Sequence, residues 1–210
     1  MVEPFRNLDP ERIRAGLDEV RSVAGPDVEI LVAGKYVPID EMEALAAAGV
    51  ELVGENRLDE LAAKQARYGG RFEWDFIGNL QSRKVRDVLP LVRLIHSVWS
   101  DSVLAQLHKH GDAGTEVLIQ VNVAGEEEKG GVAPADLAAV LERCPVRVAG
   151  LSTMPPFTVD PERSRPHFAR LAELAAEHRL AQLSMGTSQD WRVAVQEGAT
   201  ILRLGSTLFS

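Results

Sequence analysis

The sequence predicts a single (β/α)8 barrel of the TIM type, preceded by one additional N-terminal helix. Short apolar runs typical of buried strands alternate with helix-like segments along the whole 210-residue chain. Strands that alternate with helices form parallel sheets joined by crossover helices. Eight such runs follow one another without a linker or a break in composition, which favours a closed barrel over an open doubly wound sheet. We therefore expect one domain over residues 1–210.

The elements are expected in regular order along the chain. A leading helix over residues 9–24 carries Ile13, Leu17 and Val20 at helical spacing. The eight strands are predicted in the apolar runs EILVAGK (29–35), ELVGEN (51–56), WDFIGN (74–79), RLIHSV (93–98), EVLIQVNV (116–123), RVAGLSTM (147–154), QLSMG (182–186) and ILRLGSTLF (201–209). The helices between them are predicted over residues 40–49, 58–69, 82–90, 102–111, 134–144, 167–178 and 190–199. Several of these segments end in glycine, as helices often do.

Composition and charge narrow the class of protein. With 23 basic and 31 acidic side chains the formal net charge is −8, which argues against a nucleic-acid partner. The single cysteine, Cys144, allows no internal disulfide and suits a reducing compartment. Neither a signal-peptide core nor a run of membrane-spanning length is present, and no histidine has metal-ligand spacing with a carboxylate. We expect a cytoplasmic monomer without a metal site or a membrane partner.

A lysine stands where the first predicted strand ends. Strand alternation places Leu31, Ala33 and Lys35 on one face, so Lys35 points into the barrel mouth if Ile30 and Val32 face the helices. Active sites of such barrels lie at the carboxyl ends of the strands. Desolvation there would favour the neutral, nucleophilic amine. That chemistry suits a Schiff base with a carbonyl of a substrate or of pyridoxal phosphate. Alternatively, the lysine extends into solvent.

The segments GTSQD (186–190) and RLGST (203–207) follow or end the last two strands, where barrels often bind phosphate. Gly205 permits a close approach to the backbone, and hydroxyl groups lie beside backbone N–H groups in both segments. The hydroxyl-bearing candidates for a phosphate site are Thr187, Ser188, Ser206 and Thr207. A pair of turns with a helix cap is the structural alternative.

Two further polar residues lie in predicted strands. Arg203 faces inward if Leu202 and Leu204 pack outward, and there it can hold a ring nitrogen or a phosphate oxygen. The alternative is an ion pair inside the barrel, for example with Glu55. His96 is either an acid or base at a strand end or a packed barrel residue.

Seven segments together resemble the pyridoxal phosphate homeostasis protein family, whose barrel is related to the N-terminal domain of alanine racemase. They are LVAGKYVP (31–38), VGEN (53–56), FIGNLQSRKV (76–85), VLIQVNVAGEEEKGG (117–131), GLSTMPP (150–156), LSMGTSQDW (183–191) and LRLGSTLF (202–209). The resemblance implies pyridoxal phosphate as the cofactor, held as an aldimine by Lys35. It also implies that Arg203 faces the pyridine nitrogen and that Asn56 lies near the ring. The phosphate-binding positions that it implies are Thr187, Ser188, Gly205, Ser206 and Thr207.

The resemblance implies a cofactor carrier that takes part in intracellular pyridoxal phosphate supply, with apo forms of cofactor-dependent enzymes as possible recipients. An arginine at the pyridine nitrogen weakens the ring as an electron sink. A racemase also needs a second base, which alanine racemase takes from a further domain that we do not expect here. We therefore assign no catalytic residue. A weak amino-acid racemase, another pyridoxal phosphate enzyme, or an aldolase that uses Lys35 directly on a sugar phosphate are the alternatives.

Overall fold

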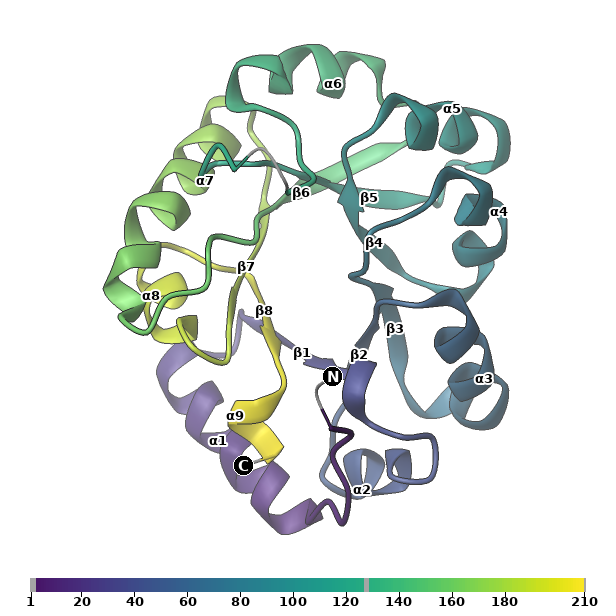
Figure 1. Cartoon of the computed structure of the whole chain (residues 1–210), viewed down its shortest axis with the longest axis vertical. Coiled ribbons are helices and arrows are strands. Elements are labelled where there is room, and N and C mark those ends of the chain that lie inside the picture. The colour runs from purple at the N-terminus through teal and green to yellow at the C-terminus, as the bar shows by residue number, and fades with distance from the viewer. Residues whose placement is uncertain (1–2, 127–128, 210) are drawn as a thin grey trace.

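The computed structural model describes residues 3–126 and 129–209, and within them the chain forms a closed parallel barrel (Figure 1). Each strand pairs with the next in chain order, and the last pairs with the first through Leu31 opposite Arg203. The predicted fold class is confirmed. The strands are β1 (Glu29–Ala33), β2 (Leu52–Glu55), β3 (Glu73–Phe76), β4 (Leu94–Val98), β5 (Glu116–Gln120), β6 (Arg147–Ser152), β7 (Gln182–Thr187) and β8 (Ile201–Leu204).

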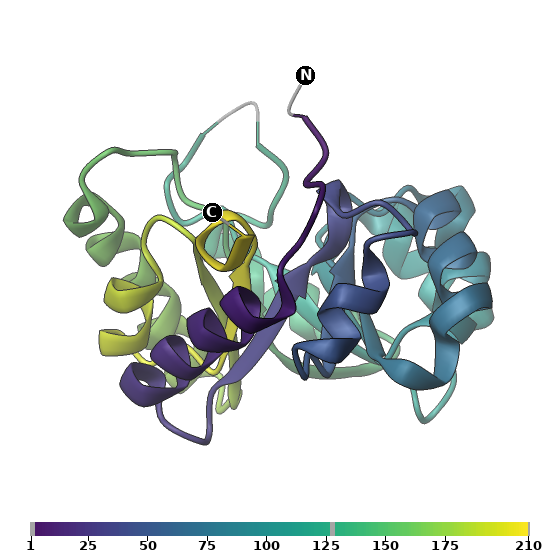
Figure 2. The same ribbon diagram turned by 90° about the horizontal axis from the view of Figure 1, so that it is seen from below.

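Helices surround the barrel. They are α1 (Pro10–Ala24), α2 (Met42–Ala47), α3 (Leu58–Tyr68), α4 (Val85–Val88), α5 (Asp101–His110), α6 (Leu137–Arg143), α7 (Arg165–Glu177), α8 (Trp191–Gln196) and α9 (Ser206–Phe209). The leading helix begins where Asp9 accepts a hydrogen bond from the Glu11 amide and where proline occupies its first position. It contacts α2, α8 and α9, so the extra helix completes the outer ring; Figure 2 shows α1 in purple beside α9 in yellow.

Most predicted boundaries shift by a few residues, and three differences have a clear local cause or position the site. The first strand ends at Ala33, and Gly34–Tyr36 forms a 3₁₀ turn in which the Val37 amide bonds the Gly34 carbonyl. The predicted helix over 82–90 is one α-helical turn, α4, between 3₁₀ turns, because Pro90 cannot continue the helical hydrogen bonds. The last predicted strand ends at Leu204, and the following residues turn into α9.

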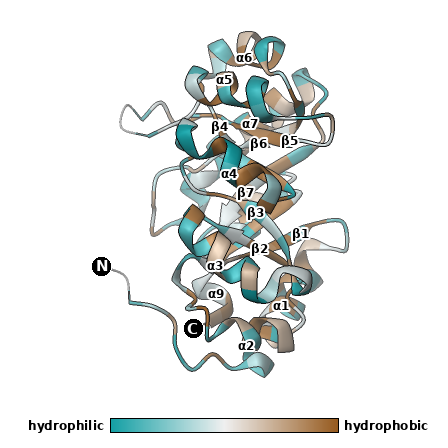
Figure 3. Ribbon diagram, turned by 90° about the vertical axis from the view of Figure 1, so that its right-hand side faces the viewer, coloured by the Kyte–Doolittle hydropathy of each residue, from teal (hydrophilic) through white to brown (hydrophobic). Residues whose placement is uncertain are grey.

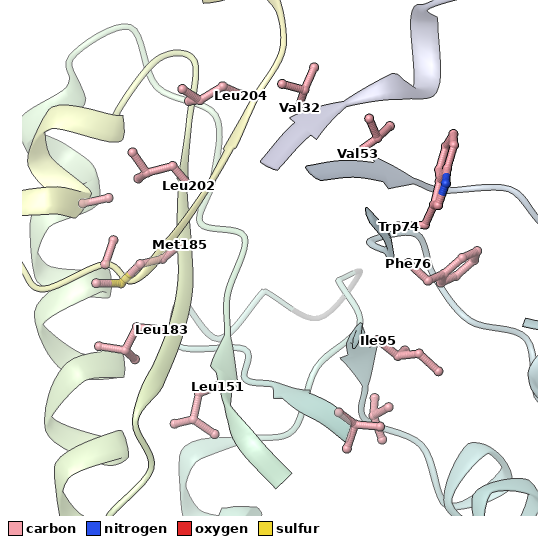
Figure 4. Packing of buried hydrophobic residues seen from close by; sticks show 14 of the residues in the cluster. Val32, Val53, Trp74, Phe76, Ile95, Leu151, Leu183, Met185, Leu202 and Leu204 are labelled. Atoms are coloured by element: carbon pink, nitrogen blue, oxygen red, sulfur yellow. The ribbon is translucent and has the colours of Figure 1, made fainter. Parts of the chain in front are cut away.

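Apolar side chains pack in two layers on opposite faces of the strands. A small inner cluster fills the barrel and contains Leu31, Leu52, Leu94, Leu118, Ala149 and Ile201. The larger cluster lies between strands and helices; Figure 4 shows Leu183, Met185 and Leu202 directed toward the helices. In Figure 3 the strands carry much of the apolar colour, whereas polar and apolar colours alternate along the helices, as expected for helices with one buried face. The alternation predicted for β1 and β8 is confirmed, since Leu31 and Ile201 face inward while Val32 and Leu202 face the helices.

The helices described here include none that is both long and apolar enough to span a membrane.

Candidate functional site

A cavity of about 810 Å³ opens at the carboxyl ends of the strands. All eight residues predicted from the sequence line it, and they come from β1, β2, β7 and β8 and the segments that follow them. They are Lys35, Asn56, Thr187, Ser188, Arg203, Gly205, Ser206 and Thr207. The parallel barrel brings these strand ends to one edge, as its topology requires. We call this cavity the barrel-mouth pocket; the contacts that its residues make with a ligand stay predictions.

Lys35 lies in the 3₁₀ turn Gly34–Tyr36, hereafter the Lys35 turn. Its side chain is exposed in the pocket, and Nζ lies 4.9 Å from the centroid of the Tyr36 ring. Within the described chain no carboxylate approaches Nζ within the 4.0 Å of an ion pair. Of the two interpretations of Lys35, the structure agrees with a side chain that extends into solvent and not with a desolvated one, because the turn after Ala33 carries the residue out of the buried strand.

A buried ion pair beneath the Lys35 turn holds it in place. Lys64 on α3 donates to the Gly34 carbonyl at 2.9 Å and to Glu55 Oε1 at 2.5 Å. Both side chains are at most 1% exposed. Burial raises the pKa of Glu55, although the charge and hydrogen bond of Lys64 oppose this rise. The backbone beside Lys35 is therefore anchored in the layer between barrel and helices.

The neighbouring wall of the pocket is built by Ser188 and the segment after β8, the strand that pairs with β1. Ser188 Oγ accepts hydrogen bonds from the backbone amides of Gly205 and Thr207, each at 3.1 Å. Thr207 Oγ1 donates back to the Ser188 carbonyl at 2.9 Å. These bonds explain why the chain leaves the strand direction after Leu204. They occupy the Gly205 and Thr207 amides and leave the Ser188 hydroxyl proton, together with the Ser206 hydroxyl, as the donors that this wall can offer to a phosphate.

The loop between β7 and α8 is fixed by a buried carboxylate. Asp190 accepts from the Thr187 amide at 2.8 Å, from Thr187 Oγ1 at 3.2 Å and from Ser164 Oγ at 2.8 Å. Gly186 has φ of +88°, and a Cβ there would lie 2.5 Å from the Ala194 Cβ, so this position requires glycine. Thr187 and Ser188 are thus held at the pocket by the loop conformation.

Arg203 forms the floor of the pocket and is 7% exposed. It donates to the carbonyls of Ser184 and Thr153, each at 2.7 Å, and to Ser184 Oγ. Burial lowers the pKa of Arg203 to about 10, opposed by the charge of Asp190, so the guanidinium stays a cation at neutral pH. The alternative of an ion pair with Glu55 is wrong, because Glu55 faces the helix layer and pairs with Lys64.

His96 is a packed barrel residue, 2% exposed, and does not line the pocket. Its Nε2 lies 3.0 Å from Asp75 Oδ2. Burial lowers the pKa of His96; Asp75 opposes this effect, whereas the positive charges of Arg203 and Arg93 reinforce it. Burial by itself would raise the pKa of Asp75, but hydrogen bonds from His96 and Arg93 outweigh it and hold that pKa below its usual range. Asp75 is thus an ionised carboxylate and His96 a neutral imidazole near pH 7.

Several lining residues were not predicted from the sequence. Phe5 reaches the pocket because its amide bonds the Tyr36 carbonyl at 2.8 Å and its ring packs 4.8 Å from that of Phe209. Met154 and Phe157 come from the long loop after β6, and Lys129 from the loop after β5. Sites in such barrels are built from the loops that follow the strands, so the loops after β5 and β6 could have been predicted to line the pocket. Nothing in the sequence, by contrast, places the segment before α1 at the barrel mouth.

The pocket fits a small phosphorylated aldehyde. Its volume lies within the range of about 300–1,000 Å³ typical of small-molecule sites. A Cβ placed on Gly205 would meet only the Ala33 Cβ at 3.8 Å, so the protein's own packing does not require glycine there and the backbone stays accessible. A primary amine, Lys35, and the hydroxyl-bearing wall around Ser188 line the same cavity. The donor set therefore matches a carbonyl group and a phosphate in one molecule.

Fold and site together define a (β/α)8 barrel protein with an amine-containing anion pocket at the carboxyl ends of its strands. Residues 8–210 match the family described as alanine racemase, N-terminal domain. The chain belongs to this family and, within it, to the pyridoxal phosphate homeostasis proteins. It is 40% identical over 195 residues to the pyridoxal phosphate homeostasis protein of Aquifex aeolicus, covering 86% of each chain. To that of Pseudomonas aeruginosa it is 36% identical over 211 residues, covering 94% of this chain and 92% of the relative.

Solved structures agree with this assignment. PipY of Synechococcus elongatus PCC7942, solved with PLP bound, superimposes with a TM-score of 0.85 at 33% identity, over 94% of this chain and 100% of PipY. The alanine racemase of Corynebacterium glutamicum matches with a TM-score of 0.75 at 18% identity, over 96% of this chain and 60% of the racemase. The racemase likeness shows the shared barrel fold. The relatives from Aquifex aeolicus and Pseudomonas aeruginosa are named pyridoxal phosphate homeostasis proteins, and the protein from Corynebacterium glutamicum is named an alanine racemase.

Proposed function

We propose that residues 1–210 act as one pyridoxal phosphate-binding domain that holds the cofactor reversibly at Lys35 and takes part in intracellular cofactor supply without robust catalysis. The observation that carries this proposal is the placement of an exposed amine and a hydroxyl-lined wall in one pocket. Membership of the homeostasis family and the likeness to PipY with PLP bound support it.

Each predicted site residue then has a specific part. When bound, pyridoxal phosphate supplies an aldehyde that condenses reversibly with a primary amine. Lys35 provides that amine, and Arg203 provides N–H donors toward the ring nitrogen. Asn56 lies beside the ring. The phosphate would lie against Thr187, Ser188, Gly205, Ser206 and Thr207. Since the Thr187, Gly205 and Thr207 amides already bond within the protein, the Ser188 and Ser206 hydroxyl groups would be its side-chain donors.

The lining of the pocket supports holding rather than turnover. Among the described residues that line it there is no aspartate, glutamate, histidine or cysteine. Lys35 and Tyr36 lie on the same turn and so on the same side, whereas a racemase needs bases on opposite faces of one carbon. Lys129 is engaged by an ion pair with Glu126 and by the Pro155 carbonyl. The pocket therefore offers little for moving a proton on and off a bound substrate.

We also propose that the protein works as a monomer in the cytoplasm and that its partners are apo forms of pyridoxal phosphate enzymes. The exposed position of Lys35 supports this role, because another amine can reach the same carbon and release the cofactor. Size-exclusion chromatography with light scattering at several concentrations tests the monomer.

Spectral titration with pyridoxal phosphate tests binding at Lys35. We expect a visible absorbance band that borohydride removes, and a mass increase that peptide mapping assigns to Lys35. Lys35→Ala should give neither, whereas Lys109→Ala, an exposed lysine on α5, should behave like the unchanged protein. A protein that develops no such band would contradict the proposal.

Cofactor transfer tests the supply role. The loaded protein is mixed with an apo-enzyme, and recovery of enzyme activity is compared with that produced by the same concentration of free pyridoxal phosphate in the presence of a competing amine. We expect faster recovery from the loaded protein. Exchange of the alanine α-proton with solvent at enzyme-like rates would instead support the racemase alternative, and turnover of a sugar phosphate without added cofactor would support an aldolase.

A further inference from the structure

A line of hydrogen-bonded side chains runs from the pocket floor to the opposite end of the barrel. Arg203 donates to Ser184 Oγ, and Ser184 Oγ lies 2.9 Å from His96 Nδ1. His96 Nε2 lies 3.0 Å from Asp75 Oδ2. Arg93, at the amino-terminal end of β4, donates to the two Asp75 oxygens at 3.2 and 3.0 Å. The proposed function uses Arg203 alone, so the rest of this line has no assigned part.

The members of this line can satisfy one another in one arrangement of protons. An ionised Asp75 only accepts hydrogen bonds, so His96 Nε2 must carry a proton and donate to it. A neutral His96 then has an unprotonated Nδ1, which accepts from the Ser184 hydroxyl. The lone pairs of Ser184 Oγ are thereby free to accept from Arg203. Every bond between Arg203 and Asp75 consequently points away from the pocket, and Arg93 donates to Asp75 from the other side.

The opposite tautomer of His96 would disturb Arg203. An Nδ1–H would donate to Ser184 Oγ, so Arg203 would share that oxygen with a second donor and the Ser184 proton would lose its acceptor. The remaining anchors of Arg203 are the carbonyls of Ser184 and Thr153, which do not depend on His96. Ser184 Oγ is thus the one described anchor through which His96 acts on Arg203.

We infer that His96 is a positioning residue for Arg203: its Nε2–H tautomer, set by Asp75 and passed on through Ser184, fixes the guanidinium that faces the ligand. The inference rests on the proposed function, because it takes Arg203 to contact the bound cofactor. It extends the binding site to three fully buried residues that do not touch the pocket.

Nuclear magnetic resonance of the ligand-free protein tests the tautomer. The 15N shifts of a labelled imidazole distinguish a protonated from an unprotonated nitrogen. At pH 7 we expect His96 to be protonated at Nε2 and unprotonated at Nδ1, with Asp75, Arg93 and Arg203 as the charged groups around it. In Ser184→Ala the Nδ1 resonance should move toward that of a nitrogen without a hydrogen-bond donor. A His96 protonated at Nδ1 would overturn the inference.

Cofactor affinity tests the action on Arg203. Ser184→Ala should weaken pyridoxal phosphate binding by about tenfold, as expected for loss of a hydrogen bond to a charged group. Ser97→Ala is the matched control. Ser97 follows His96 in the chain and is buried like Ser184, but its Oγ has no hydrogen-bond partner among the described residues. That control should change affinity by less than about twofold.

The two arms separate this inference from the proposed function. If the unchanged protein binds no pyridoxal phosphate, the proposed function fails, while the tautomer is still measured in the ligand-free protein. If it binds the cofactor and Ser184→Ala binds as tightly as Ser97→Ala, the positioning role of His96 is wrong. Weakened binding in Ser184→Ala together with the expected 15N change supports it.

Discussion

The pocket has an exposed rim and a buried polar layer beneath it, and the two are built on different principles. The rim consists of Lys35, Met154, Phe157 and Ser206, all of them exposed. We use the name buried polar layer for two sets of buried side chains: Asp75, His96, Ser184 and Arg203 inside the barrel, and Glu55 with Lys64 between the barrel and the helices. Polar groups in the layer hold one another through hydrogen bonds and ion pairs, whereas the rim groups bind little within the protein. We infer that the layer serves stability and orientation, and that the rim serves the ligand.

Breaking the ion pair of the buried layer should have the largest effect. Lys64→Met leaves the Glu55 carboxylate buried without its cation, which should lower the free energy of unfolding by about 3–5 kcal/mol. The pKa of Glu55, already raised by burial, should rise further without Lys64. A carboxyl group whose pKa is higher in the folded protein lowers the free energy of unfolding as pH rises above 4.5. The variant should therefore lose more of its free energy of unfolding at pH 8 than at pH 5. Urea denaturation at both pH values measures this.

A surface pair provides the control for Lys64. Lys84 lies 3.6 Å from Asp59, whose side chain is 66% exposed, and Lys84→Met should cost less than about 1 kcal/mol. The double variant Lys64→Met with Glu55→Leu should recover part of the loss. Equal losses in the two lysine variants would show that the buried pair contributes no more than an exposed one.

Removing the amine from the rim should affect binding and leave folding intact. Lys35→Ala should weaken retention of pyridoxal phosphate by about a hundredfold, equivalent to about 2.7 kcal/mol. Lys35 is exposed and has no ion pair within the described chain. The free energy of unfolding of the Lys35→Ala protein should therefore differ from that of the unchanged protein by less than about 0.5 kcal/mol. Equilibrium dialysis and urea denaturation measure the two quantities. A large loss of stability would place Lys35 in the same class as Lys64.

Acid should weaken the buried layer through His96. Its pKa is lower in the folded protein, so it contributes stability above 6.5, and this contribution is lost as pH falls through the folded value. In His96→Gln the amide does not titrate, and the fall in unfolding free energy below pH 6.5 should be shallower by up to about 1.4 kcal/mol per pH unit. Denaturation at a series of pH values tests this. His108→Gln, at an exposed position on α5, is the control.

The apolar part of the rim should have the smallest effect on stability. Phe157 is 81% exposed, so Phe157→Ser should change the free energy of unfolding by less than about 0.5 kcal/mol. Phe168→Ser, in which the ring is fully buried under α7, should cost several kcal/mol, on the order of the 3–5 kcal/mol of a large core truncation. Thermal and urea unfolding measure both. A destabilised Phe157 variant would mean that the loop after β6 packs on the barrel more tightly than its exposure indicates.

The barrel and the convergence of the eight site residues could be predicted because both follow from local pattern and topology. Alternation in β1 and β8 fixed which side chains face inward, and parallel strands bring their carboxyl ends together. The sequence left open whether Lys35 is desolvated or extends into solvent, since one 3₁₀ turn after Ala33 changes its surroundings without changing the apolar pattern.

Pairing inside the layer is the part that sequence patterns do not determine. The sequence allows Glu55 as a partner of Arg203, but the two residues face opposite sides of their strands, and Glu55 pairs with Lys64 from a helix. Asp75 is not among the sequence-based candidates, although a carboxylate inside the apolar run WDF is an unusual core residue. Its partners Arg93 and His96 become visible only when β3 and β4 are placed side by side.

The contact of Phe5 with Tyr36 and Phe209 has a practical consequence for handling the protein. Sequence added before Phe5 or after Phe209 begins next to the Lys35 turn, so purification tags or fluorophores joined there would share the space of an arriving ligand or recipient enzyme. The turn at Gly111–Thr115 precedes β5 and lies at the far end of the barrel. A reporter group attached in that turn would leave the approach to the pocket free and still follow the protein during cofactor delivery.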